Sequence, residues 1–316
     1  MILMKRLVLI TGSMGYVGSR MACFLASQNE LSLRLCFYKN KFKLPIAPDK
    51  AEVVPLDLIK DVDLSNICKG VDTVIHLASL NKDESESDSS RAFNVNVEGT
   101  IRLLKGASLQ GVKKFIYFST AHVYGKLEGN ITETTLAKPI SPYAITHKEA
   151  EEQVLKINEN KKPNCLVLRL SNGFGAPINK NINCWSLVIN NFCMQAATKR
   201  KIILQSDSAW QRDFITLEDI CRATLHFLML PGADVKDDIF NIGGENVLNI
   251  LEVANLISLR CTEVLGFTPQ IIHGSFTKKI EAKTFNYVID KLKSTGFTLK
   301  GKVYEEIDNT LKQCIS

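Results

Sequence analysis

The chain has 316 residues, enough to bury a substantial core in one large domain or two smaller ones. Hydrophobic residues make up 45% of it and charged residues 23%, the balance of a soluble globular protein. The net charge of +6 is spread along the chain without a basic run interleaved with aromatics, which argues against nucleic acid as a partner.

The chain also lacks the features of a membrane, secreted or metal-binding protein. No apolar run is long enough to span a bilayer, and the start of the chain reads as a strand rather than a signal peptide. The nine cysteines are scattered without a Cys-x-x-Cys pair, so most are expected to be buried small hydrophobes. We therefore expect a cytoplasmic protein with no membrane partner, no disulfide framework and no metal site.

The first element to stand out is a strand, a glycine turn and a helix at residues 7–26. Four apolar residues lead to Gly12, Gly15 and Gly18, and helix-compatible sequence begins near Tyr16. Gly12 would permit a tight turn, Gly15 a close approach to a pyrophosphate, and Gly18 close packing of helix on strand. The helix N-terminus would then stabilise phosphate, although an ordinary strand–helix turn remains the alternative.

Strands alternate with helices through the first half of the chain. The expected strands are residues 7–10, 33–38, 52–56, 72–78, 114–119 and 165–170, and the long helices are 91–110 and 143–160. This pattern predicts an α/β fold, a Rossmann-type doubly wound parallel sheet, with a smaller C-terminal substrate-binding α/β domain. The expected boundaries are 1–170 and 171–316, with segments near 212–243 returning to the first domain.

Ligands of such sheets bind beyond the carboxyl ends of the strands, so the residues there carry the next expectations. After the second strand no carboxylate is available for an adenosine ribose, and Lys39, Lys41 and Lys43 slightly favour NADP over NAD. The same lysines could equally form a solvated loop. After the third strand, Asp57 could accept a hydrogen bond from an adenine amino group.

The fourth strand ends in His76 and small residues over which a cofactor could lie. His76 by itself is expected to be a core or hydrogen-bonded histidine, and residues 82–90 a mobile polar loop. After the fifth strand come hydroxyls at Ser119 and Thr120. Tyr143 and His147 share one helix face because they are four residues apart, which predicts an acid/base site.

The chain resembles the extended short-chain dehydrogenase/reductase family, in its nucleotide-sugar epimerase/dehydratase branch. Residues 11–18 carry the family pattern Thr-Gly-x-x-Gly-x-x-Gly, and further motifs match at 57–58, 76–78, 96–100, 119–125, 169–175 and 212–219. The resemblance implies hydride transfer between a nicotinamide cofactor and a sugar carbon, with a nucleotide-sugar substrate and a homodimer formed through the two long helices.

The resemblance also implies the roles of particular residues. The catalytic residues would be Thr120, Tyr143 and His147, and the substrate would be bound by Thr120, His122, Asn172 and Arg212. The cofactor would be bound by Gly12, Met14, Gly15, Tyr16, Val17, Gly18, Lys39, Asp57, Leu58, Leu77, Ala78, Ser79, Asn96, Ser119, Tyr143 and His147.

The sequence departs from the family pattern at two places. His147 stands where the family has a lysine. Three explanations are open: His147 substitutes for the lysine, Lys148 reaches in through a local distortion, or the enzyme is slow or specialised. Ala121 and His122 stand where 4,6-dehydratases carry an Asp-Glu pair. The favoured function is therefore an epimerase, C4 dehydrogenase or 4-ketoreductase. The alternatives are a non-sugar carbonyl reductase and a cofactor-binding sensor or scaffold that has lost catalysis.

Overall fold

A computed structural model of the chain describes residues 5–39, 42–158, 163–204, 210–231, 239–274 and 284–315. The chain divides into two compact units. The first comprises Met1–Lys126, Glu133–Leu170 and Cys221–Asn241. The second comprises Leu127–Thr132, Ser171–Ile220 and Ile242–Ser316. Within the described ranges, no helix combines the length and apolar composition that crossing a membrane requires.

The first unit is built on a parallel sheet that confirms the six predicted strands. The described strands follow the order β11-β7-β5-β4-β1-β2-β3. Their bounds are β1 Arg6–Thr11, β2 Leu31–Phe37, β3 Ala51–Pro55, β4 Thr73–His76, β5 Lys114–Thr120, β7 Asn164–Leu170 and β11 Ile239–Ile242. From β1 the strands continue to β2 and β3 on one side and to β4, β5 and β7 on the other. The ends of β1 and β4 therefore lie at the topological switch point, where ligands of such sheets bind.

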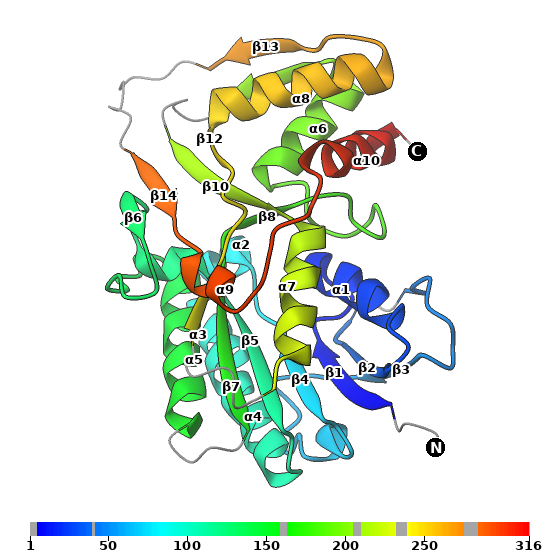
Figure 1. The fold of residues 1–316 in the computed structure, drawn as a ribbon, viewed down its shortest axis with the longest axis vertical. Coiled ribbons are helices and arrows are strands. Elements are labelled where there is room, and N and C mark those ends of the chain that lie inside the picture. The colour runs from blue at the N-terminus through cyan, green and yellow to red at the C-terminus, as the bar shows by residue number, and fades with distance from the viewer. Residues whose placement is uncertain are drawn as a thin grey trace. The chain divides into compact units, whose positions relative to one another are not determined.

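Helices cover both faces of this sheet (Figure 1). Because successive side chains of a strand point to opposite faces of the sheet, Val74 and Phe115 lie on the face toward α4 and α5. There they belong to one apolar cluster. His76 and Tyr117 follow them two residues later on the same face. The helical segments of the unit are α1 Tyr16–Ala26, η1 Asn66–Cys68, α2 Lys82–Ser87, α3 Ser89–Phe93, η2 Asn94–Glu98, α4 Gly99–Leu109, η3 Ala121–Tyr124, α5 Pro142–Asn158 and α7 Leu217–Met229, the last beginning in the second unit.

The prediction of a mobile loop at residues 82–90 is wrong, because this segment forms the short helix α2 and the start of α3. Asn81 Oδ1 accepts a hydrogen bond from Glu84 N at 3.0 Å, and the Glu84 carboxylate accepts one from Asn81 N at 3.1 Å. This capping box pairs backbone N–H groups that would otherwise lack partners at the start of a helix. Local capping thus outweighed the acidic, polar composition on which the loop prediction rested.

The second unit combines small sheets with three packed helices. Its described sheets are β12-β10-β8, β13-β9 and β14-β6, and its apolar core gathers residues of α6, α8 and α10. The bounds are β6 Gly129–Ile131, β8 Asn172–Phe174, α6 Val188–Lys199, β9 Lys201–Leu204, β10 Gln211–Thr216, β12 Val247–Asn249, α8 Ile250–Leu265, β13 Gln270–His273, β14 Phe285–Tyr287, α9 Asp290–Ser294 and α10 Val303–Ile315.

A buried ion pair fastens β7 to α5 in the first unit. Arg169 Nε and Nη2 donate to the two Glu151 carboxylate oxygens at 3.0 and 2.7 Å. The Arg169 side chain is 4% exposed and that of Glu151 0%. The guanidinium also lies 4.7 Å from the ring centroid of Tyr124. Because both charges are removed from water, each depends on the other for its stabilisation.

Replacing Glu151 with alanine should therefore lower the free energy of unfolding by about 3–5 kcal/mol, because it leaves the Arg169 charge buried without a counterion. Urea denaturation measures this loss. Glu152→Ala is the matched control, since Glu152 is 53% exposed and pairs at the surface with Lys148. Its expected cost is below about 1 kcal/mol. Equal losses in the two variants would contradict the structural role of the buried pair.

Candidate active site

The glycine turn after β1 has the geometry that the sequence predicted. Gly12 adopts φ +65°, and a Cβ there would lie 2.9 Å from Ala78 N. A Cβ on Gly18 would overlap the carbonyl oxygen of Gly12, so α1 packs directly on the turn. Gly15 is the N-cap of α1, and because it has no side chain it does not cap the first N–H groups of the helix. The turn thus aims a helix N-terminus at the sheet edge, as an anion such as pyrophosphate requires.

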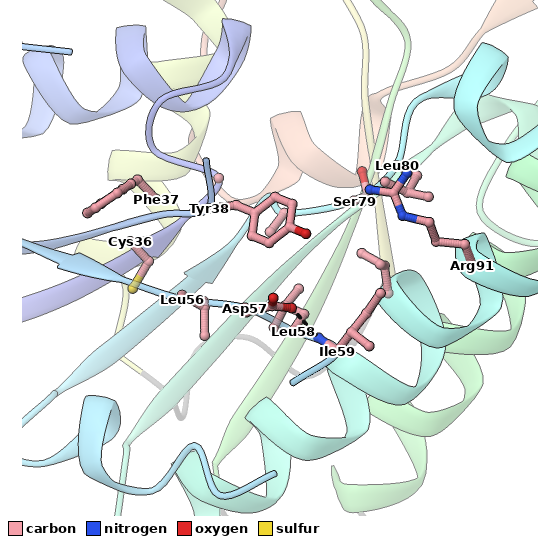
Figure 2. Close-up of a pocket in the computed structure, with 13 residues that line it drawn as sticks. Cys36, Phe37, Tyr38, Leu56, Asp57, Leu58, Ile59, Ser79, Leu80 and Arg91 are labelled. Carbon is pink, nitrogen blue, oxygen red and sulfur yellow. Dashed lines mark hydrogen bonds between the residues drawn. The ribbon is translucent and has the colours of Figure 1, made fainter. Parts of the chain in front are cut away.

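A cavity of about 170 Å³ opens beside this turn, within the first unit (Figure 2). Its walls come from the ends of β1, β2 and β3, the segment after β4, and the helical segments α3 and η2. The lining residues are Gly12, Cys36, Phe37, Tyr38, Leu56, Asp57, Leu58, Ile59, Ala78, Ser79, Leu80, Arg91 and Val95. Apolar walls with few polar groups are typical of a site that holds the flat base of a nucleotide.

Three polar side chains of this cavity have defined positions. Asp57 Oδ1 accepts hydrogen bonds from Ile59 N at 2.9 Å and Lys60 N at 3.2 Å, which fixes the carboxylate. Figure 2 shows Tyr38 beside Asp57, and Arg91 extending from α3 toward Ser79 and Leu80. Sequence reasoning missed Arg91, because a charged residue near a helix start carries no sign of the cavity it will line.

The predicted lysine cluster after β2 is only partly described. The Lys39 ammonium lies 5.1 Å from the ring centroid of Tyr38, and Lys43 is exposed. Lys41 lies outside the described residues. The cavity wall at the end of β2 consists of Cys36, Phe37 and Tyr38, and it contains no carboxylate.

His76 has the structural role that the sequence favoured. Its Nδ1 lies 2.7 Å from Thr11 Oγ1 and its Nε2 lies 2.9 Å from Thr100 Oγ1, so both ring nitrogens have partners. Burial lowers the pKa of His76 to about 3, with the nearby His147 as a smaller cause. Because Thr100 Oγ1 also donates to Asn96 O, His76 is the donor to Thr100 and carries its proton on Nε2.

Asn96 lies in η2, a π-helical segment within the long predicted helix. Its Oδ1 accepts from Leu80 N at 2.8 Å and its Nδ2 donates to Thr146 Oγ1 at 3.0 Å. Both ends of the amide are thus engaged by the chain, and they hold the segment after β4 against α5. A π-bulge of this kind commonly marks a functional site. The predicted contact of Asn96 with a cofactor stays a prediction.

The predicted catalytic residues come together at the end of β5. The rings of Tyr143 and His147 meet edge to face with centroids 4.6 Å apart, and His122 lies 6.4 Å from Tyr143 on the same basis. Burial raises the pKa of Tyr143, and a side-chain hydrogen bond with Thr120 acts in the lowering direction. Lys148 is instead paired with Glu152 at 2.7 Å, along a regular helix.

Two buried polar atoms of the site have no hydrogen-bond partner among the residues that the structure describes. They are Nε2 of His147 and Oγ of Ser119. The two residues are 3% and 5% exposed, respectively. A buried polar atom without a partner is destabilising unless a ligand supplies one. Together with the glycine turn and the apolar cavity, these atoms fit a dinucleotide that carries a base at one end and hydrogen-bonding groups at the other.

His147 is anchored from its other nitrogen. Nδ1 lies 2.8 Å from the Tyr117 hydroxyl, whose side chain is 2% exposed. Burial lowers the pKa of His147 to about 4, and the charge of His122 contributes in the same direction. The imidazole is therefore neutral over the physiological pH range. Sequence reasoning missed Tyr117, which reads as one more apolar residue of a buried strand.

Asn172 and Arg212 lie in the second unit. Asn172 Nδ2 donates to the carbonyl oxygen of Asp213 at 3.0 Å. The Asp213 carboxylate accepts from Ser171, Gly244 N and Asn246 N, which fixes the end of β10. Burial alone lowers the pKa of Arg212, so no carboxylate of the described residues offsets its desolvation. A half-buried guanidinium of this kind suits an anionic ligand.

Comparisons with known proteins show which proteins this chain resembles. The sequence profile described as the NAD dependent epimerase/dehydratase family matches residues 8–243. The UDP-glucose 4-epimerase of Mycoplasma genitalium is 29% identical, over 96% of this chain and 98% of that protein.

Two solved structures show the same fold and confirm the predicted fold class. The UDP-N-acetylglucosamine 4-epimerase of Methanobrevibacter ruminantium M1, in complex with UDP-N-acetylmuramic acid, superposes with a TM-score of 0.84 at 22% identity, over 99% of both chains. MoeE5, in complex with UDP-glucose and NAD, superposes with a TM-score of 0.78 at 24% identity, over 98% of this chain and 99% of that one.

The buried position of His147 predicts a pH dependence of stability. Its pKa of about 4 in the folded protein lies below the ordinary 6.5, so the unfolded chain binds this proton more tightly. Stability should therefore fall as the pH drops from 6.5 to 4, by on the order of 3 kcal/mol from this group.

Urea midpoints at several pH values should show a shallower acid loss in His147→Gln than in the wild type. His273→Gln, at an exposed position of β13, should keep the wild-type slope. Identical slopes in the wild type and His147→Gln would show that His147 is not buried as described.

Proposed function

The chain belongs to the NAD dependent epimerase/dehydratase family, and we propose that it performs nicotinamide-dependent redox chemistry on a nucleotide-linked sugar. The reaction is that of an epimerase, C4 dehydrogenase or 4-ketoreductase. The observation that carries this proposal is the convergence of Thr120, Tyr143 and His147. Thr120 is hydrogen-bonded to the Tyr143 phenol, the His147 ring packs edge to face against the Tyr143 ring, and His147 Nε2 has no partner among the described residues.

The proposed mechanism assigns one task to each of these residues. A nicotinamide dinucleotide held by the glycine turn and the adjoining cavity would supply the acceptor and donor of hydride for the sugar carbon. Tyr143 removes the proton from the hydroxyl on that carbon, or returns it. The Thr120 hydroxyl donates its single proton to the Tyr143 phenolate before this transfer and to the reacting oxygen after it. Since burial raises the pKa of Tyr143, the hydrogen bond with Thr120 is what favours its phenolate form.

The second unit supports a nucleotide-sugar rather than another carbonyl compound. Arg212 is a desolvated cation without an acidic partner among the described residues, and a diphosphate would supply the missing charge. The side-chain nitrogen of Asn172 is bound to the backbone of Asp213, so the side-chain oxygen of Asn172 remains available to a ligand. We propose that Asn172 and Arg212 bind the diphosphate, and that His122 contacts the sugar.

The residues after Thr120 support redox chemistry without water elimination. Elimination of water requires an acid and a base near the reacting carbons. Ala121 is buried and apolar, and His122 is the exposed residue that follows it. No carboxylate stands at either position. This favours an epimerase, dehydrogenase or ketoreductase over a 4,6-dehydratase.

The proposed cofactor is NAD. The matching family is NAD dependent by description, and the complex of MoeE5 contains NAD. The slight preference for NADP rested on three lysines, and the comparisons lend it no support. We propose that the adenosine lies in the cavity near Tyr38 and Asp57, with Arg91 as the nearby cation of the described lining.

We further propose a homodimer in the cytoplasm. The helices α4 and α5 carry apolar side chains that remain exposed, with Leu109 exposed by 78% and Ile145 by 40%. A second copy packing against these helices would remove both from water.

Replacing Tyr143 with phenylalanine should reduce turnover by about 10²–10⁴-fold while NAD binding is retained, because only the proton transfer is lost. The assay incubates the protein with NAD and a panel of nucleotide sugars, and follows nicotinamide absorbance and products by mass spectrometry. Tyr304→Phe, at a position 55% exposed on α10, is the matched control.

The same panel separates the alternatives. A wild-type protein that binds NAD but converts no nucleotide sugar and no other carbonyl compound would be a sensor or scaffold. Conversion of free carbonyl compounds alone would instead show a non-sugar reductase. Either result would contradict the proposed function.

Arg91→Met should weaken NAD binding by roughly tenfold, because a charge-assisted hydrogen bond to the cofactor is lost. Titration calorimetry with NAD and NADP measures the affinities, and the wild type should bind NAD more tightly. Lys105→Met, at an exposed position of α4, is the control for loss of a positive charge. Unchanged NAD affinity in Arg91→Met would place the cofactor outside the cavity of Figure 2.

A further inference from the structure

The hydrogen bond between Tyr117 and His147 has a direction that the surrounding contacts determine. The Tyr117 hydroxyl and His147 Nδ1 are 2.8 Å apart, and either group could formally be the donor. Both side chains are buried, at 2% and 3% exposure. The direction matters because it decides whether the proton of the imidazole is on Nδ1 or on Nε2, the nitrogen without a partner among the described residues.

Counting the buried polar groups left unpaired decides between the two directions. If Nδ1–H donated to the phenol, the Tyr117 O–H would have no acceptor among the described residues, and Nε2 would be an unpartnered acceptor. If the phenol donates to Nδ1, its O–H is paired and only the Nε2–H awaits a partner. The first arrangement leaves two buried polar groups unpaired and the second leaves one, and the additional unpaired group disfavours the first by roughly fivefold to 150-fold.

The charges around His147 oppose the doubly protonated form. Glu151, one turn further along α5, is already bound to Arg169 through two hydrogen bonds. On β4, His76 is neutral with both nitrogens paired. From η3, the charge of His122 acts against protonation of His147, and Tyr143 packs against the ring as a phenol. No described carboxylate therefore offers His147 a direct counterion.

We propose that Tyr117 is a positioning residue that holds His147 in the neutral tautomer with its proton on Nε2. The imidazole then presents a fixed N–H donor to an oxygen of the bound ligand. That this ligand is a nicotinamide dinucleotide, with a ribose hydroxyl as the acceptor, rests on the proposed function. The tautomer itself is a property of the protein alone.

This arrangement separates two tasks that a single cation would perform together. A neutral N–H donor can hold a ligand hydroxyl, but it brings no positive charge to Tyr143 at 4.6 Å between ring centroids. The acidity of the phenol is then left to Thr120 and to the bound ligand. In this chain His147 orients the ligand, and it does not by charge lower the pKa of the phenol.

Two-bond ¹H–¹⁵N correlation spectra of the ¹⁵N-labelled full-length protein test the proposal. His147 is assigned as the histidine whose signals disappear in His147→Gln. The expected pattern shows a protonated Nε2 and an unprotonated Nδ1, unchanged between pH 5 and pH 8. A predominant Nδ1–H tautomer or an imidazolium at pH 7 would overturn the proposal.

Tyr117→Phe should remove the preference, so that the two ring nitrogens move toward an averaged shift. Tyr124→Phe is the matched control, because Tyr124 is equally buried and its hydroxyl donates to Asn241 at 2.6 Å. It should leave the His147 pattern unchanged. If Tyr117→Phe does not fold, the wild-type spectrum decides the question by itself.

Failure of this proposal differs from failure of the proposed function. A protein inactive on every nucleotide sugar but with the Nε2–H pattern would contradict only the function and would support the tautomer. An active enzyme with the Nδ1–H pattern would contradict only the tautomer.

Discussion

Pairing of buried polar groups between the sheet and the helices α4 and α5 is the constraint on which the site depends. The strand alternation that buries Val74 and Phe115 against these helices also turns His76 and Tyr117 toward them. Each of these polar groups then needs a partner inside the protein. His76 finds threonines on β1 and α4, and Tyr117 finds His147 on α5. Near the end of β5, Ser119 Oγ and His147 Nε2 remain without a partner among the described residues.

This constraint explains how a histidine can stand where the resemblance leads one to expect a lysine. A buried ammonium without a counterion would be strongly disfavoured unless the ligand compensated it. An imidazole at position 147 avoids that cost, because one nitrogen is paired with Tyr117 and the ring is neutral. The consequence is a Tyr143 whose acidity depends on its hydrogen bond with Thr120 and on the ligand. We infer that the protein gives up charge stabilisation of the phenolate in return for a rigid donor.

Much of the first unit followed from the sequence because its determinants are local. Apolar runs predicted six strands, and the spacing of Gly12, Gly15 and Gly18 predicted a turn whose positive φ and close backbone approach are confirmed. Residues 82–90 were predicted wrongly because composition was weighed above the Asn81 capping box. Tyr117 and Arg91 were missed for a different reason. Their roles come from contacts with residues distant in sequence, and neither side chain differs locally from an ordinary strand or helix residue.

The most direct test of the account is a crystal structure of the protein with NAD and a nucleotide diphosphate. The adenosine is expected beside Tyr38 and Asp57, and His147 Nε2 within about 2.7–3.2 Å of a hydroxyl on the nicotinamide ribose. The Tyr143 hydroxyl is expected to face the nicotinamide ring. A nicotinamide bound away from Tyr143, or a His147 Nε2 with no ligand oxygen within hydrogen-bond distance, would contradict the account.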